Sequence, residues 1–343
     1  MHIHNKNKTL IHTYRQGLYD LEPTNLENHL SSYFATDADI HLAFPFEDVA
    51  GPKDLYERVY APLIKAIPDL ERRDYIVIAG NGEAGDLEGN WVGCAGFYTG
   101  VFEDFWLDIP PTRHPVTMRF HEFYRVEGDK IVAMQALWDI PELMMQANAW
   151  PMTPSLGTQW LVPSPATQDG IVTEPYDAKK SGESRKLILD MLSGLQRHKD
   201  EGAEAMGLEQ YWHPKMHWYG PAGIGTNRRI SGFRKWHQIP FLKAMPDREG
   251  SVKGNPTGIL FADGDYAAVT GWPNMHMTIS GDGWLGIAPS NQKITMRSLD
   301  FWRTERGLIR ENWVLVDLLH VYNQIRVDVF ERMRELSYAR QPR

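Results

Sequence analysis

Apolar and polar positions along the chain predict helices at the start of each half. Helices are expected over residues 8–19 and 25–34, and again over 184–197 and 201–212. Within 184–197, apolar side chains recur at intervals compatible with a helix, although not cleanly on one face. A shorter helix is expected next, over 55–67 and over 233–245, and each is ended by a Pro-Asp pair.

Strands are expected after these helices. In the first half the pattern predicts them at 75–79, 91–102, 116–126 and 131–137, and in the second half at 259–261, 266–272, 294–304 and 308–315. Gly128 and Gly307 lie between the last two strands of each half, where glycine supplies the positive φ of a tight hairpin turn. Helices followed by a run of antiparallel strands predict an α+β fold.

The two halves are copies of one unit. Residues 117–139 match residues 295–317 without a gap, an offset of 178 (317 − 139 = 178), and the same offset holds from residue 62 to residue 146. Chance matches would scatter over many offsets, so the repeat indicates a tandem duplication. A segment rich in Pro, Gly, Ser and Thr without periodicity separates the copies. We predict a first domain over 1–165, a linker over 166–182 and a second domain over 183–343.

Composition and charge exclude several classes of protein. The 42% hydrophobic and 23% charged residues are ordinary for a globular chain, and no apolar run approaches the roughly 20 residues of a membrane span. The start of the chain lacks a secretion signal, so we expect a cytoplasmic protein. A net charge of −8 argues against nucleic acid as a partner.

Metal and cofactor sites are not expected. Cys94 is the only cysteine, which excludes an intrachain disulfide and any multi-cysteine metal centre. The spacing of His213 and His217 would suit two ligands of one metal ion, but no third ligand stands at motif distance. The glycine-rich segment 220–225 does not follow a phosphate-binding spacing.

Each copy resembles one known family. A glycine that opens a helix, a Pro-Asp pair at its end, and a strand hairpin that ends in W-x-x-x-D before a glutamine are similar to the SnoaL-like polyketide cyclases, of the nuclear transport factor 2-like superfamily. The residues that carry the likeness are Gly51, Pro68, Asp69, Arg119, Phe123, Asp139 and Gln146, then Gly232, Pro246, Asp247, Arg297, Phe301, Trp313, Asp317 and Gln324. Only the second copy has the full W-x-x-x-D, because Gln135 replaces the tryptophan in the first.

The resemblance implies two tandem cone-shaped domains, each a curved mixed or antiparallel sheet wrapped around helices, with an apolar pocket at the wide mouth. It implies cofactor-independent acid/base catalysis of the lyase or isomerase kind on a hydrophobic small molecule, by aldol cyclisation, isomerisation or dehydration. The tandem pair could stand in for a dimer, and further homodimerisation stays open. The alternative is a non-catalytic small-molecule-binding or assembly module of the same fold.

Asp139 and Asp317 are the first candidate catalytic residues, because the resemblance implies an acid/base aspartate in the pocket. Counting by twos along the last strand of each copy places them at the end of a largely apolar face. Desolvation there would raise the carboxyl pKa into the range useful for proton transfer. The alternative is a strand-end aspartate that caps the following helix.

Glu122 and Asp300 occupy equivalent positions on the preceding strand and give each copy a second candidate acid or base. The alternative for this pair is a salt bridge with Arg119, Arg125 or their repeats. Aromatic and imidazole side chains could bind the substrate, and the alternative for most of them is plain core. The substrate-binding candidates are Trp218, His237, Trp272, His276, Trp302 and Trp313 in the second copy, and His41, Trp91 and Tyr124 in the first. If only one copy is active, we expect it to be the second.

Overall fold

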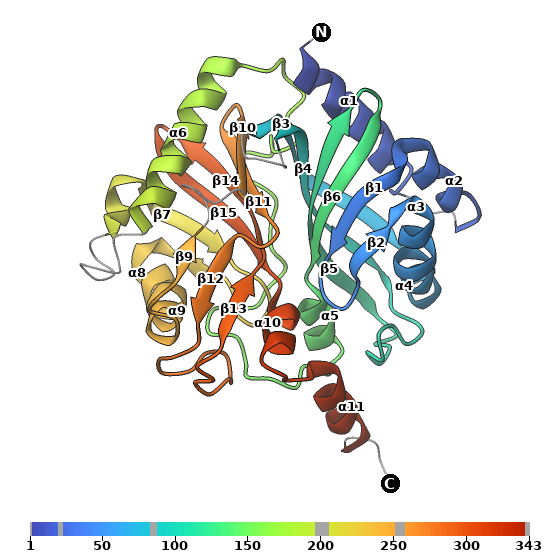
Figure 1. Cartoon of the computed structure of the whole chain (residues 1–343), viewed down its shortest axis with the longest axis vertical. Helices are drawn as coiled ribbons and strands as arrows, with labels where there is room; N and C mark the ends of the chain where they lie inside the picture. Colours follow the sequence, from blue (N-terminus) through green and yellow to red (C-terminus); the bar gives the residue numbers. More distant parts are fainter. Residues whose placement is uncertain (1, 20–22, 83–87, 196–205, 251–257, 340–343) are drawn as a thin grey trace.

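The two halves of the chain fold into the same sequence of elements, as a computed structural model of the protein shows (Figure 1). The structure describes residues 2–19, 23–82, 88–195, 206–250 and 258–339. The first half contains α1 (Ile3–Gln16), α2 (Pro23–Tyr33), β1 (Phe34–Leu42), β2 (Glu47–Ala50), α3 (Gly51–Asp54), the π-helical turn η1 (Leu55–Tyr60), α4 (Ala61–Ala66), β3 (Glu71–Gly82), β4 (Gly89–Val101), β5 (Pro115–Glu127), β6 (Lys130–Trp138) and α5 (Ile140–Gln146).

The second half repeats this order. It contains α6 (Ala178–Gly194), the 3₁₀ turn η5 (Leu208–Gln210), β7 (Trp212–Tyr219), β8 (Asn227–Arg228), α8 (Arg229–Phe233), the π-helical turn η6 (Arg234–Gln238), α9 (Ile239–Ala244), β9 (Glu249–Gly250), β10 (Gly258–Asp263), β11 (Tyr266–Gly271), β12 (Met275–Thr278), β13 (Lys293–Met296), β14 (Ser298–Glu305), β15 (Leu308–Val316), α10 (Leu318–Gln324) and α11 (Val329–Ala339). The offset of 178 residues holds for whole elements, since it separates the starts of β1 and β7, of β6 and β15, and of α5 and α10. The α+β tandem fold is therefore confirmed.

Each domain is built on an open mixed sheet. In the first domain the strand order is β2-β1-β6-β5-β4-β3, with β1 parallel to β6 and the other pairs antiparallel. The second domain has the equivalent order β10-β11-β14-β15-β7-β8, and β13, β12 and β9 form a separate three-stranded sheet. The parallel strand of each sheet lies next to the final hairpin. It therefore places the helices at the start of the domain beside that hairpin, over a common core.

Several element boundaries differ from the sequence expectation. β1 and β7 were not predicted, and Trp212, placed at the end of an expected helix, is the first residue of β7. Residues 201–205 of that expected helix lie outside the described part of the chain, and residues 208–210 form the 3₁₀ turn η5. The expected strand 294–304 is divided into β13 and β14 at Arg297. β12 was also missed, because four residues are too few to show a period.

The two sheets pack against each other, with α1 to α4 on the outer side of one and α6, α8 and α9 on the outer side of the other, while α5 and α10 lie near the middle (Figure 1). Phe123 of β5 and Phe301 of β14 are equivalent residues, and their ring centroids lie 5.0 Å apart across the interface. His121 Nδ1 lies 2.6 Å from the carbonyl oxygen of Leu299 in the same region. Gly93 allows the close approach, because a Cβ there would lie 2.9 Å from the Phe301 ring. Equivalent residues that meet across an interface are the mark of two-fold symmetry, so the tandem has the arrangement of a dimer within one chain.

Candidate active site

The second domain encloses a cavity of about 120 Å³ between its helices and the inner face of its sheets. Its wall is mainly apolar and aromatic, formed by Met191, Leu192, Leu195, Met206, Leu208, Trp212, Trp218, Ile224, Phe233, Phe241, Leu242, Met275, Met296, Trp302, Val314 and Val316. The polar residues of the wall are His237, Gln238, Arg248, Ser298, Asp300 and Asn312. A concave apolar site with a few converging polar groups is the usual form of a small-molecule site.

Asp300 is the carboxylate of this wall. It stands in the middle of β14, where its cross-strand neighbours are Val269 on β11 and Val314 on β15. Ser298 Oγ donates a hydrogen bond of 2.7 Å to Asp300 Oδ1. Burial raises the pKa of Asp300 to about 7, although the bond from Ser298 and the positive charge of Arg248 both favour the ionised form. At neutral pH the carboxyl group is therefore poised to release or accept a proton.

His237 faces the same cavity from η6. Its ring stacks on Trp218, with centroids 4.1 Å apart and planes 16° from parallel. Burial lowers the pKa of His237 to about 3, so the imidazole is neutral at physiological pH. Its Nδ1 atom is buried and has no hydrogen-bond partner among the described residues.

Three further buried polar atoms of the wall lack a hydrogen-bond partner in the part of the chain that the structure describes. They are the indole nitrogens of Trp212 and Trp302 and the side-chain oxygen of Gln238. Buried polar groups in native proteins are nearly always hydrogen-bonded, and an unpaired one costs free energy. The cavity therefore presents hydrogen-bonding capacity that a polar ligand can use.

The equivalent carboxylate of the first domain, Glu122, is enclosed by side chains. Trp138 Nε1 donates to its Oε1 atom over 2.8 Å, and the Tyr98 hydroxyl donates to the same atom over 3.1 Å. Arg72 and the Tyr124 hydroxyl both donate to Oε2. The expected alternative of a salt bridge thus applies to Glu122, with Arg72 of β3 as the partner in place of Arg119 or Arg125.

The difference between the domains follows from the residues around these carboxylates. Glu122 sits among large aromatic side chains, and the equivalent positions of the second domain hold smaller residues that line the cavity. Leu192 stands where the first domain has Tyr14, Gln238 where it has Tyr60, Ser298 where it has Phe120, and Val316 where it has Trp138. The same fold is therefore filled with side chains around Glu122 and hollow beside Asp300.

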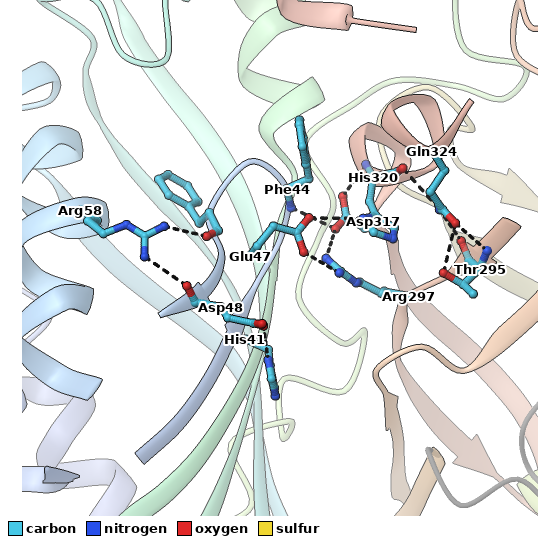
Figure 2. Close-up of polar contacts among 11 residues, drawn as sticks. His41, Phe44, Glu47, Asp48, Arg58, Thr295, Arg297, Asp317, His320 and Gln324 are labelled. Carbon is cyan, nitrogen blue, oxygen red and sulfur yellow. Dashed lines mark hydrogen bonds and ion pairs between the residues drawn. The ribbon is translucent and has the colours of Figure 1, made fainter. Parts of the chain in front are cut away.

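Asp317 lies at the domain interface and does not line the cavity of the second domain. Its Oδ2 atom accepts the backbone N–H of Phe44 from the first domain over 3.0 Å, and Arg297 lies 3.3 Å from the same atom (Figure 2). Its Oδ1 atom accepts the N–H of His320 over 3.1 Å, so it also caps α10, as the alternative interpretation expected. Burial raises the pKa of Asp317 despite the charge of Arg297.

Glu47 completes this side of the interface. It pairs with Arg297 over 2.6 Å and with His320 over 3.3 Å, and Figure 2 shows it reaching from the first domain toward both. Burial opposes its ionisation, but the hydrogen bonds from His320 and Arg297 outweigh burial and lower the pKa of Glu47 to about 2. Glu47 is therefore a permanent anion between the domains.

Asp139 makes the equivalent contact from the first domain. Its Oδ2 atom accepts the backbone N–H of Ala222 from the second domain over 2.9 Å and pairs with Arg119 over 2.9 Å. Ala222 and Phe44 are equivalent positions, so the two aspartates exchange reciprocal bonds across the interface. The alternating pattern was right that the strand-end aspartates close a largely apolar face, but that face meets the other domain and is not the inner wall of a pocket.

The remaining aromatic candidates are divided between several places. Trp218 and Trp302 line the cavity, whereas Trp91 and Trp313 belong to the apolar cluster between the two sheets. His276 is exposed on β12. The other candidates lie at the interface or in the first domain: Trp272 stacks 5.9 Å from His41 and 4.4 Å below Arg297, and Tyr124 contacts Glu122.

Comparison with known families decides the class of the protein. The family described as SnoaL-like polyketide cyclase matches residues 24–147 and 198–325, which is more than half of the chain. The chain belongs to this family. No curated protein matches it. Among the described residues, no helix is long and apolar enough to cross a membrane.

Solved structures of similar proteins each match about one SnoaL-like domain. IdmH from Streptomyces antibioticus is 21% identical over 40% of this chain and 97% of its own, with a TM-score of 0.32. AclR from Streptomyces galilaeus is 20% identical over 42% of this chain and 96% of its own, with a TM-score of 0.33. An NTF2-like protein from Burkholderia xenovorans is 12% identical over 42% of this chain and 95% of its own, with a TM-score of 0.32.

Sequence reasoning missed part of the cavity in the second SnoaL-like domain. Arg248, Ser298, Trp212 and Gln238 line it but were not candidates. A usable signal was present at these positions, because each differs in kind from its equivalent in the first copy: Leu70, Phe120, Phe34 and Tyr60. Divergence between the copies therefore marks the cavity better than their shared motif does.

The reciprocal aspartates lead to a stability prediction. Asp317→Asn removes a charge that Arg297 contacts and weakens the acceptor of the Phe44 N–H, so we expect the free energy of unfolding to fall by about 1–3 kcal/mol. Urea unfolding followed by circular dichroism measures this, with Asp282→Asn as the control because Asp282 is exposed and makes none of the contacts described for Asp317. An unchanged urea midpoint would show that the interface does not depend on this carboxylate.

Proposed function

We propose that the second domain is a cofactor-independent acid/base enzyme that acts on a small, largely apolar carbonyl compound. Asp300 is the group that moves the proton. The observation that carries the proposal is a carboxyl group with a pKa near 7 on the wall of an apolar and aromatic cavity. Such a pKa places both protonation states within reach at neutral pH, which is the condition for efficient general acid/base catalysis.

A single carboxylate in such a wall can act first as a base and then as an acid. The ionised Asp300 removes a proton from the carbon next to the substrate carbonyl, and the electron pair of that C–H bond moves to give an enolate. In an isomerisation, the protonated Asp300 returns the proton to another carbon of the same system. In an aldol closure, the enolate carbon attacks a second carbonyl and the resulting alkoxide takes the proton.

His237 supports this assignment as a second polar group of the cavity. Its imidazole is neutral, and its unpartnered Nδ1 atom can accept or donate a hydrogen bond according to the tautomer. Stacking on Trp218 fixes the orientation of the ring. His237 can therefore hold a substrate oxygen while Asp300 acts on carbon.

The first domain fits the alternative of a non-catalytic module. Four donors occupy both oxygens of Glu122, and aromatic side chains fill the space that is open beside Asp300. We propose that this domain serves as a scaffold, which stabilises the second domain through the shared sheet interface.

Exchange of carbon-bound protons for deuterium tests the proposal without knowledge of the natural substrate. The protein is incubated in D₂O with cyclohexanone, acetophenone and ethyl acetoacetate, and loss of the proton signals next to the carbonyl is followed by NMR. We expect exchange above the buffer rate for at least one compound. Failure to accelerate any of them would contradict the proposed carbonyl chemistry.

The pH dependence of that exchange is a separate prediction. Since the base is the ionised form of Asp300, the enzyme-dependent rate should rise as pH increases through about 7 and level off above it. Below the pKa the carboxyl group is protonated and cannot accept the proton. His237 stays neutral over this range and Arg248 stays charged, because their pKa values are about 3 and about 10. A rate without inflection between pH 5 and 9 would argue against Asp300 as the base.

A further inference from the structure

Arg248 differs from the other buried arginines of the protein. Arg72, Arg119, Arg297 and Arg303 each have a carboxylate partner, such as Asp139 at 2.9 Å from Arg119 and Glu311 at 2.6 Å from Arg303. No carboxylate of the described residues forms an ion pair with Arg248. Its side chain contacts the sulfur of Met275, 3.6 Å from Nη2, and the ring of Phe241, 5.9 Å from Cζ.

The guanidinium of Arg248 lies in the wall of the cavity. Burial lowers the pKa of Arg248 to about 10, while the charge of Asp300 on the same wall opposes this shift. The side chain stays charged at neutral pH in spite of its surroundings. A charge in an apolar wall without a direct ion-pair partner is costly, which favours an anion as its ligand.

Two tryptophans of the same wall carry further donors. Trp302 and Trp212 are 2% and 3% exposed, both line the cavity, and neither Nε1 atom has a hydrogen-bond partner among the described residues. An indole N–H can only donate. Together with Arg248, the wall therefore offers one positive charge and two neutral donors to a ligand.

None of these three donors exists in the first domain. The equivalent positions hold Leu70 for Arg248, Tyr124 for Trp302 and Phe34 for Trp212. Tyr124 donates to Glu122, and Leu70 and Phe34 are buried core residues. The three donors are present in the second domain, which has the cavity, and absent from the first, whose centre is filled. This is expected of residues that bind a ligand.

We propose that the second domain binds its ligand by a negatively charged oxygen, which Arg248 holds, while the Trp302 and Trp212 indole N–H groups can donate to other polar atoms of the ligand. The ligand is a small apolar molecule, and its oxygen belongs either to a carboxylate or to the enolate formed when Asp300 removes a proton from a carbonyl compound. The enolate source rests on the function proposed above, and the carboxylate source does not. Charge-assisted hydrogen bonds of this kind are the strong ones in proteins.

Equilibrium binding of ring-sized probes tests the proposal. An apolar cavity of about 150 Å³ accepts benzene in another protein, so a single ring suits this site. Benzoate and benzamide are compared by calorimetry at pH 6, where Asp300 is mostly protonated and does not repel an anion. Substituted phenols of increasing acidity, as enolate mimics, form the second arm.

The expected result for a carboxylate ligand is that wild-type protein binds benzoate about tenfold or more tighter than benzamide. For an enolate ligand, phenol affinity rises with acidity. In either arm Arg248→Gln should remove the preference for the anion and leave benzamide binding within about twofold, which also shows that the fold is intact. Arg248→Lys should retain part of the preference, and Lys243→Gln, which removes a charge from the outside of α9, should retain all of it.

Equal affinity for benzoate and benzamide, together with phenol affinity that is independent of acidity, would overturn the proposal. So would absence of binding by every probe, or an equal loss of charged and neutral ligands in Arg248→Gln. The result is independent of the deuterium exchange experiment. Anion preference without exchange would contradict the proposed function and leave the anion site. Exchange without anion preference would contradict the anion site and leave the proposed function.

Discussion

Replacement of Asp300 by asparagine is expected to slow the exchange of carbon-bound protons by about 100-fold or more, since a positioned general base contributes about 10²–10⁴-fold to such a step. Asparagine keeps the shape of the side chain and can still accept the hydrogen bond from Ser298 Oγ, so the wall of the cavity should be preserved. It cannot accept a proton from carbon. NMR exchange rates at pH 8, where wild-type Asp300 is mostly ionised, give the largest contrast.

Two matched carboxylates serve as controls for Asp300→Asn. Glu122→Gln changes the equivalent residue of the filled domain, and Asp317→Asn changes the interface aspartate that the family resemblance singled out. Both variants should retain exchange rates within about threefold of wild type, because neither residue lines the cavity. If Asp317→Asn loses exchange while folded and Asp300→Asn retains it, the acid/base role belongs to Asp317.

The sequence alone was sufficient for the architecture. The offset of 178 residues requires only that both copies keep the residues of one core, and the offset persists in the structure from β1 and β7 to α5 and α10. Gly128 and Gly307 also lie in the predicted hairpin turns, with positive φ at both. Local signals of this kind depend on neighbours in the chain, which a sequence shows directly.

The inner face of the sheet could not be identified in the same way. Leu137 and Leu315 lie on the face that meets the other domain, whereas Met134 and Val314 lie on the face toward the helices. Both faces are buried and apolar, so the alternation that normally separates core from solvent is lost. Asp139 and Asp317 were placed beside a pocket for this reason. Glu122 and Asp300, on the other face, are the carboxylates at the centre of each domain.

The arginines Arg72 and Arg248 were also beyond prediction. Arg72 and Arg248 perform unlike tasks and do not occupy equivalent positions, since Gly250 and Leu70 stand at the respective repeats. Pairing of β3 with β4 and of β4 with β5 brings Arg72 to Glu122, whereas Arg248 lines the cavity without an ion pair to a described carboxylate. The motif shared by the copies therefore describes the fold, and the residues that differ between them determine which domain has a cavity.

The filled centre of the first domain gives the other large expected effect. Arg72 is fully buried, and it pairs with Glu122 and with Asp74, the latter over 2.9 Å. Its guanidinium also lies 4.1 Å from the centre of the Phe120 ring. Arg72→Met leaves Glu122 buried without a counter-ion, and breaking a buried pair in this way costs about 3–5 kcal/mol. We expect a fall of that size in the free energy of unfolding, measured by urea denaturation.

Arg73→Met is the matched control for this loss, because the neighbouring arginine is exposed and its pair with Glu71, at 2.6 Å, is worth at most about 1 kcal/mol. The double variant Arg72→Met/Glu122→Gln should recover part of the stability, since it removes both charges of the pair. Hydrogen exchange by mass spectrometry should localise the loss to β3, β4 and β5. A loss below about 1 kcal/mol in Arg72→Met would mean that Glu122 finds other compensation, and that the Arg72–Glu122 pair does not stabilise the first domain as expected.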